Sequence, residues 1–364
     1  MISPLSASSR TVLIRTSRKQ KRISFWLIHA ASLGAPFTGV SPVALLVCLT
    51  FYLVRMFAIT GWYHRYFSHR SFKTGRITQF AFAFLGCMAC QKGPLWWASH
   101  HREHHLYSDG PLDPHSPVQR GFWYSHILWF LDPSSYAVRE ERIRDLIRYP
   151  ELRWLETFHW LAPLSAVAGI FLVGLGLRAW MPDLETGAIQ LVVWGFFIST
   201  VLVYHGTFSI NSLAHLMGRA RYETGDKSRN NPLLALATLG EGWHNNHHHF
   251  PTSARQGFFW WEVDFTYYGL KALESMGLIW DVKTVPEKVR DSGRRVESAL
   301  AVRPGSRIPL PCSIPQVPRF RLRSRPTAAV APASPAHRGL PGLSGGLYPL
   351  LRHPGLGLRR PGLA

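Results

Sequence analysis

The chain has 364 residues, 46% of them hydrophobic and 17% charged, and it contains 14 Trp and 21 Phe. This composition favours a membrane protein over a soluble enzyme. The net charge of +20 comes mostly from basic residues near the two ends of the chain, which is not the pattern of a nucleic-acid-binding surface, so no nucleic-acid partner is expected.

Residues 1–24 form a basic N-terminal arm without acidic residues. A basic arm before an apolar segment is typical of a topology signal or of a contact with anionic lipid. No compact apolar region ending in a small-residue cleavage site follows it, so we expect no cleaved signal peptide.

Four apolar stretches predict transmembrane helices, at residues 25–37, 43–62, 158–180 and 188–210. The first is short and could instead form a half-buried hairpin arm with the second. Residues 80–97 are also apolar, but Gln91, Lys92, Gly93 and Pro94 interrupt them. We expect that stretch to be interfacial or partly buried, because a fifth span would place the later histidine clusters on opposite sides of the membrane.

The distribution of charge between the spans predicts their orientation. Residues 63–156 carry about a dozen Lys and Arg, whereas the loop at residues 35–42 has none. The positive-inside rule therefore places this segment and both termini in the cytoplasm. The predicted fold is an all-α integral membrane protein with about four spans and a cytoplasmic helical cap.

Three short stretches are rich in histidine: His64-Arg-Tyr-Phe-Ser-His69, His101-Arg-Glu-His104-His105 and His244-Asn-Asn-His247-His248-His249. The second and third repeat the spacing i, i+3, i+4, which puts three imidazoles on one helical face. Residues five apart do not share a face of an α-helix, so His64 and His69 are expected where a helix ends or unwinds. Imidazole suits iron, zinc and copper, and the pattern predicts a metal centre on the cytoplasmic side.

Other candidate groups have weaker signals. His100 and His249 adjoin the clusters but point off the ligand faces, so they are expected to support the site or to be neutral. Cys87-Met-Ala-Cys90 has the spacing of a metal site but lacks a second cysteine pair, which favours packing. Residues 291–364 are rich in Arg and Pro without periodicity and are expected to form a disordered tail.

Together with Asn211-Ser-Leu-Ala-His215 and Gly240-Glu-Gly-Trp-His244, the clusters resemble those of membrane fatty acyl-CoA desaturases of the stearoyl-CoA (delta-9) type. The resemblance also includes Asp113-Pro-His115 and Arg120-Gly-Phe-Trp-Tyr-Ser-His126, and it implies a desaturase domain over residues 25–290.

The resemblance implies two iron ions and a set of ligands. Asn211 would hold a ligand-like position through a water molecule. The histidine ligands would be His64, His69, His101, His104, His105, His215, His244, His247 and His248.

The implied reaction inserts a cis double bond, expected at delta-9, into a saturated acyl chain, most simply an acyl-CoA. An unactivated methylene is too inert for a side-chain base, so hydrogen removal needs an oxidant derived from O2. The electrons would come from a ferredoxin or a b-type cytochrome with its reductase. His353-Pro-Gly-Leu356 departs from a haem-binding motif, so no fused electron carrier is expected.

The acyl chain would occupy a bent apolar tunnel among the spans. Candidate wall residues are Trp97, Tyr204 and Phe208, and Cys48 and Tyr52 are candidates for the tunnel floor that sets chain length. Animal acyl-CoA desaturases commonly have an Arg-Asp pair where this chain has Ser99-His100, which keeps acyl-lipid and acyl-carrier-protein substrates open. A membrane di-iron hydroxylase of alkanes or lipids is the alternative enzyme, and a metal carrier is the non-catalytic one.

Overall fold

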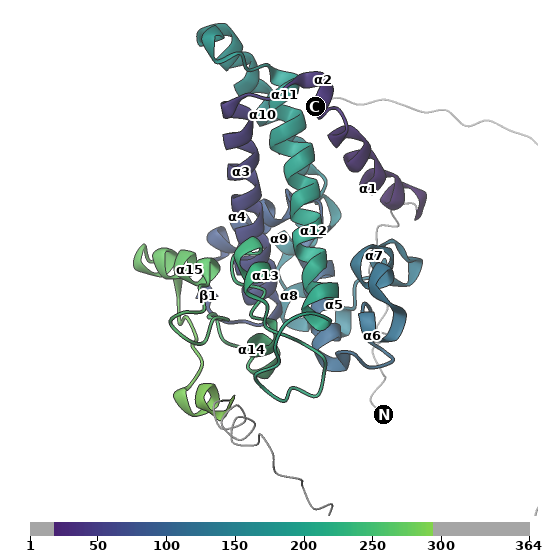
Figure 1. Ribbon diagram of the computed structural model, residues 1–364, viewed down its shortest axis with the longest axis vertical. Helices are drawn as coiled ribbons and strands as arrows, with labels where there is room; N and C mark the ends of the chain where they lie inside the picture. The colour runs from purple at the N-terminus through teal and green to yellow at the C-terminus, as the bar shows by residue number, and fades with distance from the viewer. Residues whose placement is uncertain (1–17, 294–364) are drawn as a thin grey trace, which may run out of the picture. The chain divides into compact units, whose positions relative to one another are not determined.

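A computed structural model describes residues 18–293. It is almost entirely helical, and Figure 1 shows its helices in chain order. The first seven α-helices are α1 (Arg18–Ser32), α2 (Ala35–Thr38), α3 (Pro42–Phe57), α4 (Arg76–Cys87), α5 (Pro94–Tyr107), α6 (Pro117–Arg120) and α7 (Trp129–Leu131). They are followed by α8 (Arg144–Ile147), α9 (Pro150–Thr157), α10 (Leu161–Trp180), α11 (Ala188–Val192), α12 (Ser199–Ser212), α13 (Pro232–Ala237), α14 (His244–His249) and α15 (Phe265–Ser275).

Three π-helical segments continue or join these helices, at Ala58–Ser68, Tyr124–Leu128 and Val193–Ile198. Short 3-10 turns occupy Pro133–Ser135, Glu140–Arg142, Pro182–Leu184 and Leu213–His215. Two strands, β1 (Lys73–Thr74) and β2 (Ile279–Trp280), pair antiparallel and join the segment after the first span to the segment after α15.

Within residues 18–293, three continuous helices are long and apolar enough to cross a membrane: Pro42–Ser68, Leu161–Trp180 and Ala188–His215. They correspond to three of the four expected spans, and the first and third run five or six residues further than the hydropathy pattern predicts. The residues added at those two ends include His64 of the first histidine cluster and the motif Asn211-Ser-Leu-Ala-His215, whose polar residues a search for apolar runs leaves out.

The expected span at residues 25–37 is not one continuous helix. α1 ends at Ser32, and Leu33 and Gly34 separate it from α2, whose first turn contains Pro36. The 15 residues of α1 rise about 22 Å, less than the ~30 Å of a hydrocarbon core. The structure therefore has three helices of spanning length and one short helix, packed against α12 and Val193–Ile198.

The interrupted apolar stretch at residues 80–97 forms the end of α4 and the start of α5. Gln91 and Lys92 lie in the turn between α4 and α5, and Pro94 is the first residue of α5. Neither helix has spanning length. The chain therefore returns to the same end of the spans, which is what a single metal centre requires.

The outer limits of the chain differ slightly from the expected boundaries. Residues 18–24 of the basic arm belong to α1, and residues 287–293 are helical, so the expected start of the tail at residue 291 falls inside a helix. The rest of the predicted tail, and residues 1–17, lie outside the described residues.

Arg55 is the one charged residue within the apolar part of the first span, and it is fully buried. Its guanidinium donates to the Phe51 carbonyl at 3.0 Å, to the Thr200 hydroxyl at 2.6 Å and to the Met88 carbonyl at 3.3 Å. It also donates to the hydroxyl of Ser199. Arg55 therefore ties α3 to α12 and to the end of α4 instead of meeting lipid.

The contacts of Arg55 predict the effect of removing it. Arg55→Ala should lower the free energy of unfolding by about 2 kcal/mol, because hydrogen bonds to a charged group are lost and a cavity remains. Arg55→Met should be milder, since it fills the volume without a buried charge. The midpoint of thermal unfolding in detergent measures both. Arg178→Ala, on an exposed residue of α10, is the control, and equal midpoints for Arg55→Ala and this control would contradict the assigned role.

Candidate metal centre

The first histidine pair lies where the first span changes its helical geometry. Ala58–Ser68 is π-helical, His64 lies inside it, and His69 follows its last residue. A π-helix bonds residue i to residue i+5, so residues five apart come to one face. The rings of His64 and His69 are 5.0 Å apart between centroids. The expectation that this pair lies where a helix unwinds and ends is confirmed, and the π-helix supplies the physical reason.

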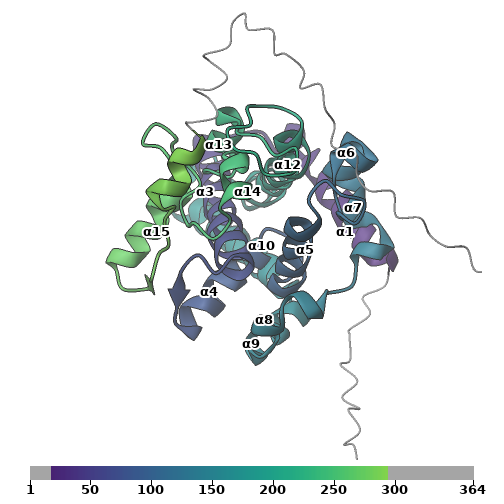
Figure 2. The same cartoon turned by 90° about the horizontal axis from the view of Figure 1, so that it is seen from below.

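The other two clusters occupy two short helices at the same end of the spans. α5 carries His101, His104 and His105, and α14 carries His244, His247 and His248. In Figure 2, α14 lies between α5 and the ends of α3 and α12. His215 reaches the centre from the 3-10 turn that ends the third span.

The nine histidines form two groups whose ring nitrogens converge. Within each group the candidate ligand atoms all lie within 4.8 Å of one another. The first group is His64, His69, His101, His105 and His247, and the second is His104, His215, His244 and His248. Every one of the histidines that the resemblance implied is therefore in a group that can hold a metal ion.

The closest contacts are between Nε2 atoms. His247 Nε2 lies 3.0 Å from His64 Nε2 and 2.9 Å from His105 Nε2. In the second group, the Nε2 atoms of His215 and His244 are 3.0 Å apart. Rings that all direct the same nitrogen at a common point are arranged as ligands, since two bare lone pairs repel each other without a cation between them.

In four of these rings, a carboxylate contacts Nδ1, the nitrogen that faces away from the centre of the group. Nδ1 of His104 donates to Asp113 at 3.0 Å, Nδ1 of His215 to Asp109 at 2.8 Å, and Nδ1 of His248 to Asp226 at 2.6 Å. Nδ1 of His64 pairs with Glu241. A proton on Nδ1 leaves Nε2 free to bind a metal and fixes the ring orientation, as in other histidine-ligated metal sites.

These acidic partners were not assigned a role from the sequence. Asp113 and Glu241 lie in two motifs of the desaturase resemblance, Asp113-Pro-His115 and Gly240-Glu-Gly-Trp-His244. An acidic residue beside a histidine in these motifs could have indicated their role. Asp109 and Asp226 lie in loops distant from the histidines that they contact, and no spacing rule could have found them.

Burial keeps several of the imidazoles neutral. It lowers the pKa of His101, His105, His244 and His247 well below the usual value, and the neighbouring histidines lower it further. A neutral imidazole has the free lone pair that a metal requires. Nε2 of His248 is buried without a protein hydrogen-bond partner among the described residues, so this ligand nitrogen is free for a metal ion and the donor set fits one.

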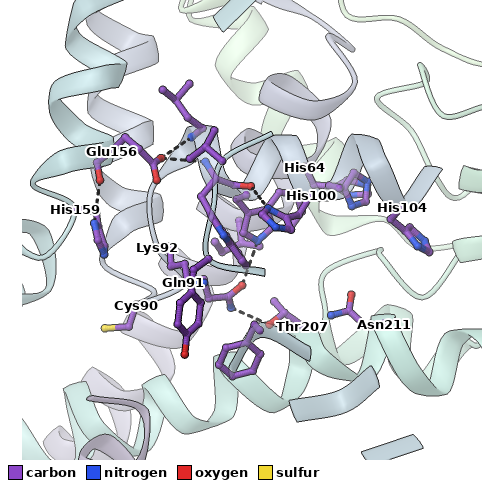
Figure 3. A pocket seen from close by; sticks show the side chains of 18 of the residues that line it. His64, Cys90, Gln91, Lys92, His100, His104, Glu156, His159, Thr207 and Asn211 are labelled. Carbon is purple, nitrogen blue, oxygen red and sulfur yellow. Dashed lines mark hydrogen bonds between the residues drawn. The ribbon is translucent and has the colours of Figure 1, made fainter. Parts of the chain in front are cut away.

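His100 and His249 belong to neither group. His249 stacks on Tyr222 with ring centroids 4.0 Å apart, and His100 packs on Trp96 at 4.4 Å. The prediction that both point away from the ligand faces agrees with these positions. Asn211, one turn before His215, lies in the wall of the adjoining cavity and is labelled in Figure 3.

A cavity of about 1900 Å³ adjoins the two groups. Its wall includes His64, His101, His104 and His244 from the groups and a large share of aromatic side chains. Three expected substrate contacts line it: Trp97, Tyr204 and Phe208. A metal centre that opens on an apolar cavity can act on a hydrocarbon chain held there.

The other two expected substrate contacts, Cys48 and Tyr52, do not line this cavity. They line a separate groove of about 490 Å³ on the other side of α3 and α12. The Tyr52 hydroxyl donates to the Ala237 carbonyl, which turns the ring toward α13. Thr238 lines both spaces, so the groove and the cavity share a wall.

Comparisons with known proteins agree with this arrangement. A family model described as fatty acid desaturase matches residues 40–275. An acyl-CoA 5-desaturase from Anemone leveillei is 42% identical over 268 residues, which cover 72% of this chain and 78% of that protein.

Two proteins from Arabidopsis thaliana are also similar. Delta-9 acyl-lipid desaturase 1 is 38% identical over 75% of this chain and 88% of its own length. A chloroplastic palmitoyl-monogalactosyldiacylglycerol delta-7 desaturase is 35% identical over 79% of this chain and 76% of its own length. The histidine groups, the adjoining cavity and these matches show that the chain belongs to the fatty acid desaturase family.

Proposed function

We propose that the protein is an O2-dependent desaturase that inserts a cis double bond, at delta-9, into a saturated fatty acyl chain. The observation that supports this proposal best is the opening of two histidine groups onto a large aromatic-lined cavity, in a chain of this family. The family match favours desaturation over the insertion of a hydroxyl group.

The proposed cofactor is a pair of iron ions held by the nine histidines of the two groups, with Asn211 in a ligand-like position near the second group. Imidazole ligands without thiolates suit a centre that is repeatedly oxidised. The chemistry that bound iron supplies is the activation of O2 for removal of hydrogen from an unactivated methylene.

The contribution of the protein's own residues is to position the acyl chain and exclude water. Gln91 accepts from the Trp97 indole at 3.3 Å and donates to the Thr207 hydroxyl at 2.8 Å, and all three residues line the cavity. This bridge fixes the distance between α5 and α12 along the acyl chain. Phe25, Phe130 and the stacked rings of Tyr204 and Phe208 keep the adjoining wall apolar.

The expected acyl carrier is CoA, with an acyl lipid or an acyl-carrier protein as alternatives. The relatives support this range, since one is named for acyl-CoA and others for acyl lipids. The same relatives are named for positions 5, 7 and 9, so delta-9 is proposed from the resemblance and not from a distance in the cavity.

We further propose a multi-pass membrane protein with a desaturase domain over residues 25–290. His64 and His69 lie at the end of the first spanning helix and His215 at the end of the third, so the centre forms on one side of the membrane. The arginine-rich segment at residues 63–156 supports a cytoplasmic position for that side and for both termini. Electrons would arrive there from a ferredoxin or a b-type cytochrome.

Expression in a host that lacks its own desaturase tests the proposal. Lipid profiling with double-bond mapping should find new cis monoenes, whereas hydroxylated lipids would indicate the alternative enzyme. His247→Ala should abolish the product, because His247 contacts ring nitrogens from both other clusters. His249→Ala, which removes a ring outside both groups, is the control. If the two variants were equally inactive, the ligand assignment in α14 would be wrong.

The carboxylate contacts predict a graded effect on metal binding. Asp113→Asn should retain the fold but lower iron affinity about 10- to 100-fold, because the charge that orients His104 is lost. Competition with a chelator, followed by metal analysis of the purified protein, measures the change from the two irons expected in the wild type. Asp281→Asn, at an exposed pair with Lys73, is the matched control. Equal affinities in the two variants would refute the role of Asp113.

The shared wall between the cavity and the groove predicts a change in chain length. Tyr52 and Met56 both pack on Gly206, and Met56 lines the cavity. Tyr52→Ala should join the two spaces and shift products toward longer acyl chains without moving the double bond. Gas chromatography of the products measures this shift. Leu46→Ala, 63% exposed on the same helix, is the control, and an unchanged profile in Tyr52→Ala would exclude Tyr52 as a determinant.

A further inference from the structure

A loop at residues 216–229 follows the third span, and the proposed function does not use it. The loop is closed at its base, because the Arg229 N–H donates to the Ala214 carbonyl at 2.7 Å and Arg219 forms an antiparallel bridge with Asn230. Figure 1 shows the segment between α12 and α13 beside α14, at the end of the described fold opposite α2 and α11. The loop therefore lies on the side of the histidine groups that faces away from the spans.

Two hydrogen-bonded paths connect the loop to rings of the second histidine group. Asp226, within the loop, contacts Nδ1 of His248 at 2.6 Å. The Lys227 N–H donates to Oδ2 of Asp109 at 2.8 Å, and the same oxygen accepts from Nδ1 of His215 at 2.8 Å. Both aspartate side chains are 6% exposed, whereas Lys227 is exposed. One layer of loop residues therefore separates these two rings from solvent.

The outer surface of the loop carries positive charge. Arg219 and Lys227 are exposed, and Arg229 is half-buried. Within residues 18–293, none of these three cations forms an ion pair with a carboxylate. Glu223 is the one exposed acidic residue of the loop. Three cations against one exposed carboxylate give this surface a net attraction for an acidic partner.

Exposed apolar side chains lie beside these cations. Leu216 and Met217, which follow His215, are 45% and 55% exposed. Met and Arg are enriched at the centres of protein interfaces, while charges at the rim mainly speed association. The loop combines both features on a small area, as expected of the short-lived encounters through which proteins exchange electrons.

The proposed reaction needs electrons that neither the acyl chain nor O2 provides. Formation of one double bond releases two electrons and two protons, whereas reduction of O2 to two water molecules takes four of each. The other two electrons and two protons must therefore come from outside the substrate. A protein that donates electrons needs a surface that is both exposed and connected to the metal ligands, and the 216–229 loop meets both conditions.

We propose that the 216–229 loop is the docking surface for a small acidic protein that carries one electron at a time, and that electrons enter through the second histidine group. This inference rests on the proposed function, since it takes the grouped histidines to hold iron. Each docking event oxidises the iron–sulfur or haem group of the carrier by one electron and reduces the metal centre by one. Two such events, with two protons from solvent, complete the balance for one double bond.

A second basic surface, on α8 and α9, lacks this connection to the ligands. Arg144, Arg148 and Arg153 are exposed there. Asp145 of α8 contacts Arg102 at 2.7 Å and, within the described residues, no grouped histidine. α9 also leads into the spanning helix α10 after residues 158–160, which places this surface next to the membrane. It is therefore the rival surface in the test.

The test uses the full-length, iron-loaded protein in phosphatidylcholine nanodiscs and carriers of opposite charge. The acidic probes are a plant-type ferredoxin and the soluble haem domain of a b-type cytochrome, and the basic probe is cytochrome c. Arg219→Glu with Lys227→Glu reverses the charge of the loop. Arg144→Glu with Arg148→Glu makes the same change of net charge on the rival surface and is the matched control. Surface plasmon resonance measures binding, and stopped-flow absorbance measures oxidation of the pre-reduced carrier.

At low salt, the wild type should bind at least one acidic carrier and should not bind cytochrome c. The loop variant should bind that carrier about 10-fold or more weakly and oxidise it more slowly, whereas the control variant should match the wild type. At an ionic strength of about 1 M, where the screening length is roughly 3 Å, the difference between the wild type and the loop variant should disappear. Iron content, and the rate of reduction by photoreduced deazariboflavin, should be equal in all three proteins, because this small neutral donor needs no docking surface.

Equal affinities of the wild type and the loop variant for the acidic carrier would overturn the docking surface, and so would a loss confined to the control variant. A loop variant that lost iron, or that accepted electrons slowly from deazariboflavin, would assign the loop to holding the metal centre instead. A wild type that binds neither acidic carrier, yet forms monoene with deazariboflavin, would overturn the docking surface alone. A wild type that oxidises a carrier but forms no monoene would overturn the proposed function.

Discussion

Nine imidazoles must be brought to two points, and the rest of the structure depends on that requirement. Each ring has to face its neighbours in spite of the repulsion between lone pairs. No single helix can supply nine such rings. The spans, α5 and α14 therefore meet at one end of the membrane helices, where the first and third spans end in histidines instead of apolar residues.

Two arginine ion pairs, one buried and one half-buried, anchor the ends of the chain segments that carry these rings. Arg65, next to His64, donates to Asp264 at 2.9 Å and to Glu241 at 3.0 Å, and Glu241 in turn pairs with His64. One guanidinium thus connects the first span, the loop before α14 and the start of α15. A second, Arg102, lies between His101 and His104 and donates to Asp145 at 2.7 Å and to carbonyls that precede His69. Both arginines join different histidine clusters, so they fix the distances between ligands as well as the fold.

The cavity follows from the same arrangement. α5 carries three of the grouped histidines as well as Trp96 and Trp97, and the Trp97 ring stacks on His101 at 5.0 Å, so the helix that would hold the metal also forms a wall of the cavity. The bridge from Gln91 to Thr207 joins the segment before α5 to α12 along this wall.

The sequence by itself determined the family and most of the histidines that come together in two groups able to hold metal ions. It did so because H-x-x-H-H places imidazoles on one face of any α-helix, whatever the helix packs against. Three of the spans were also determined locally, since their apolar runs are as long as a bilayer is thick. The short first helix was the weakest local signal, and Gly34 with Pro36 interrupts it.

Only the tertiary structure decided which carboxylate meets which ring and which side of a span faces the cavity. Asp226 contacts His248 from 22 residues away and Asp109 contacts His215 from 106, and loop closure of that kind has no local periodicity. Tyr52 lies on the same span as His64, yet its hydroxyl bonds to Ala237 and faces the groove, because rotation about the helix axis is set by packing against α12 and α13. Spacing along one helix gives the distance of a residue from the histidine groups along the helix axis, whereas the direction of its side chain depends on the packing of neighbouring helices.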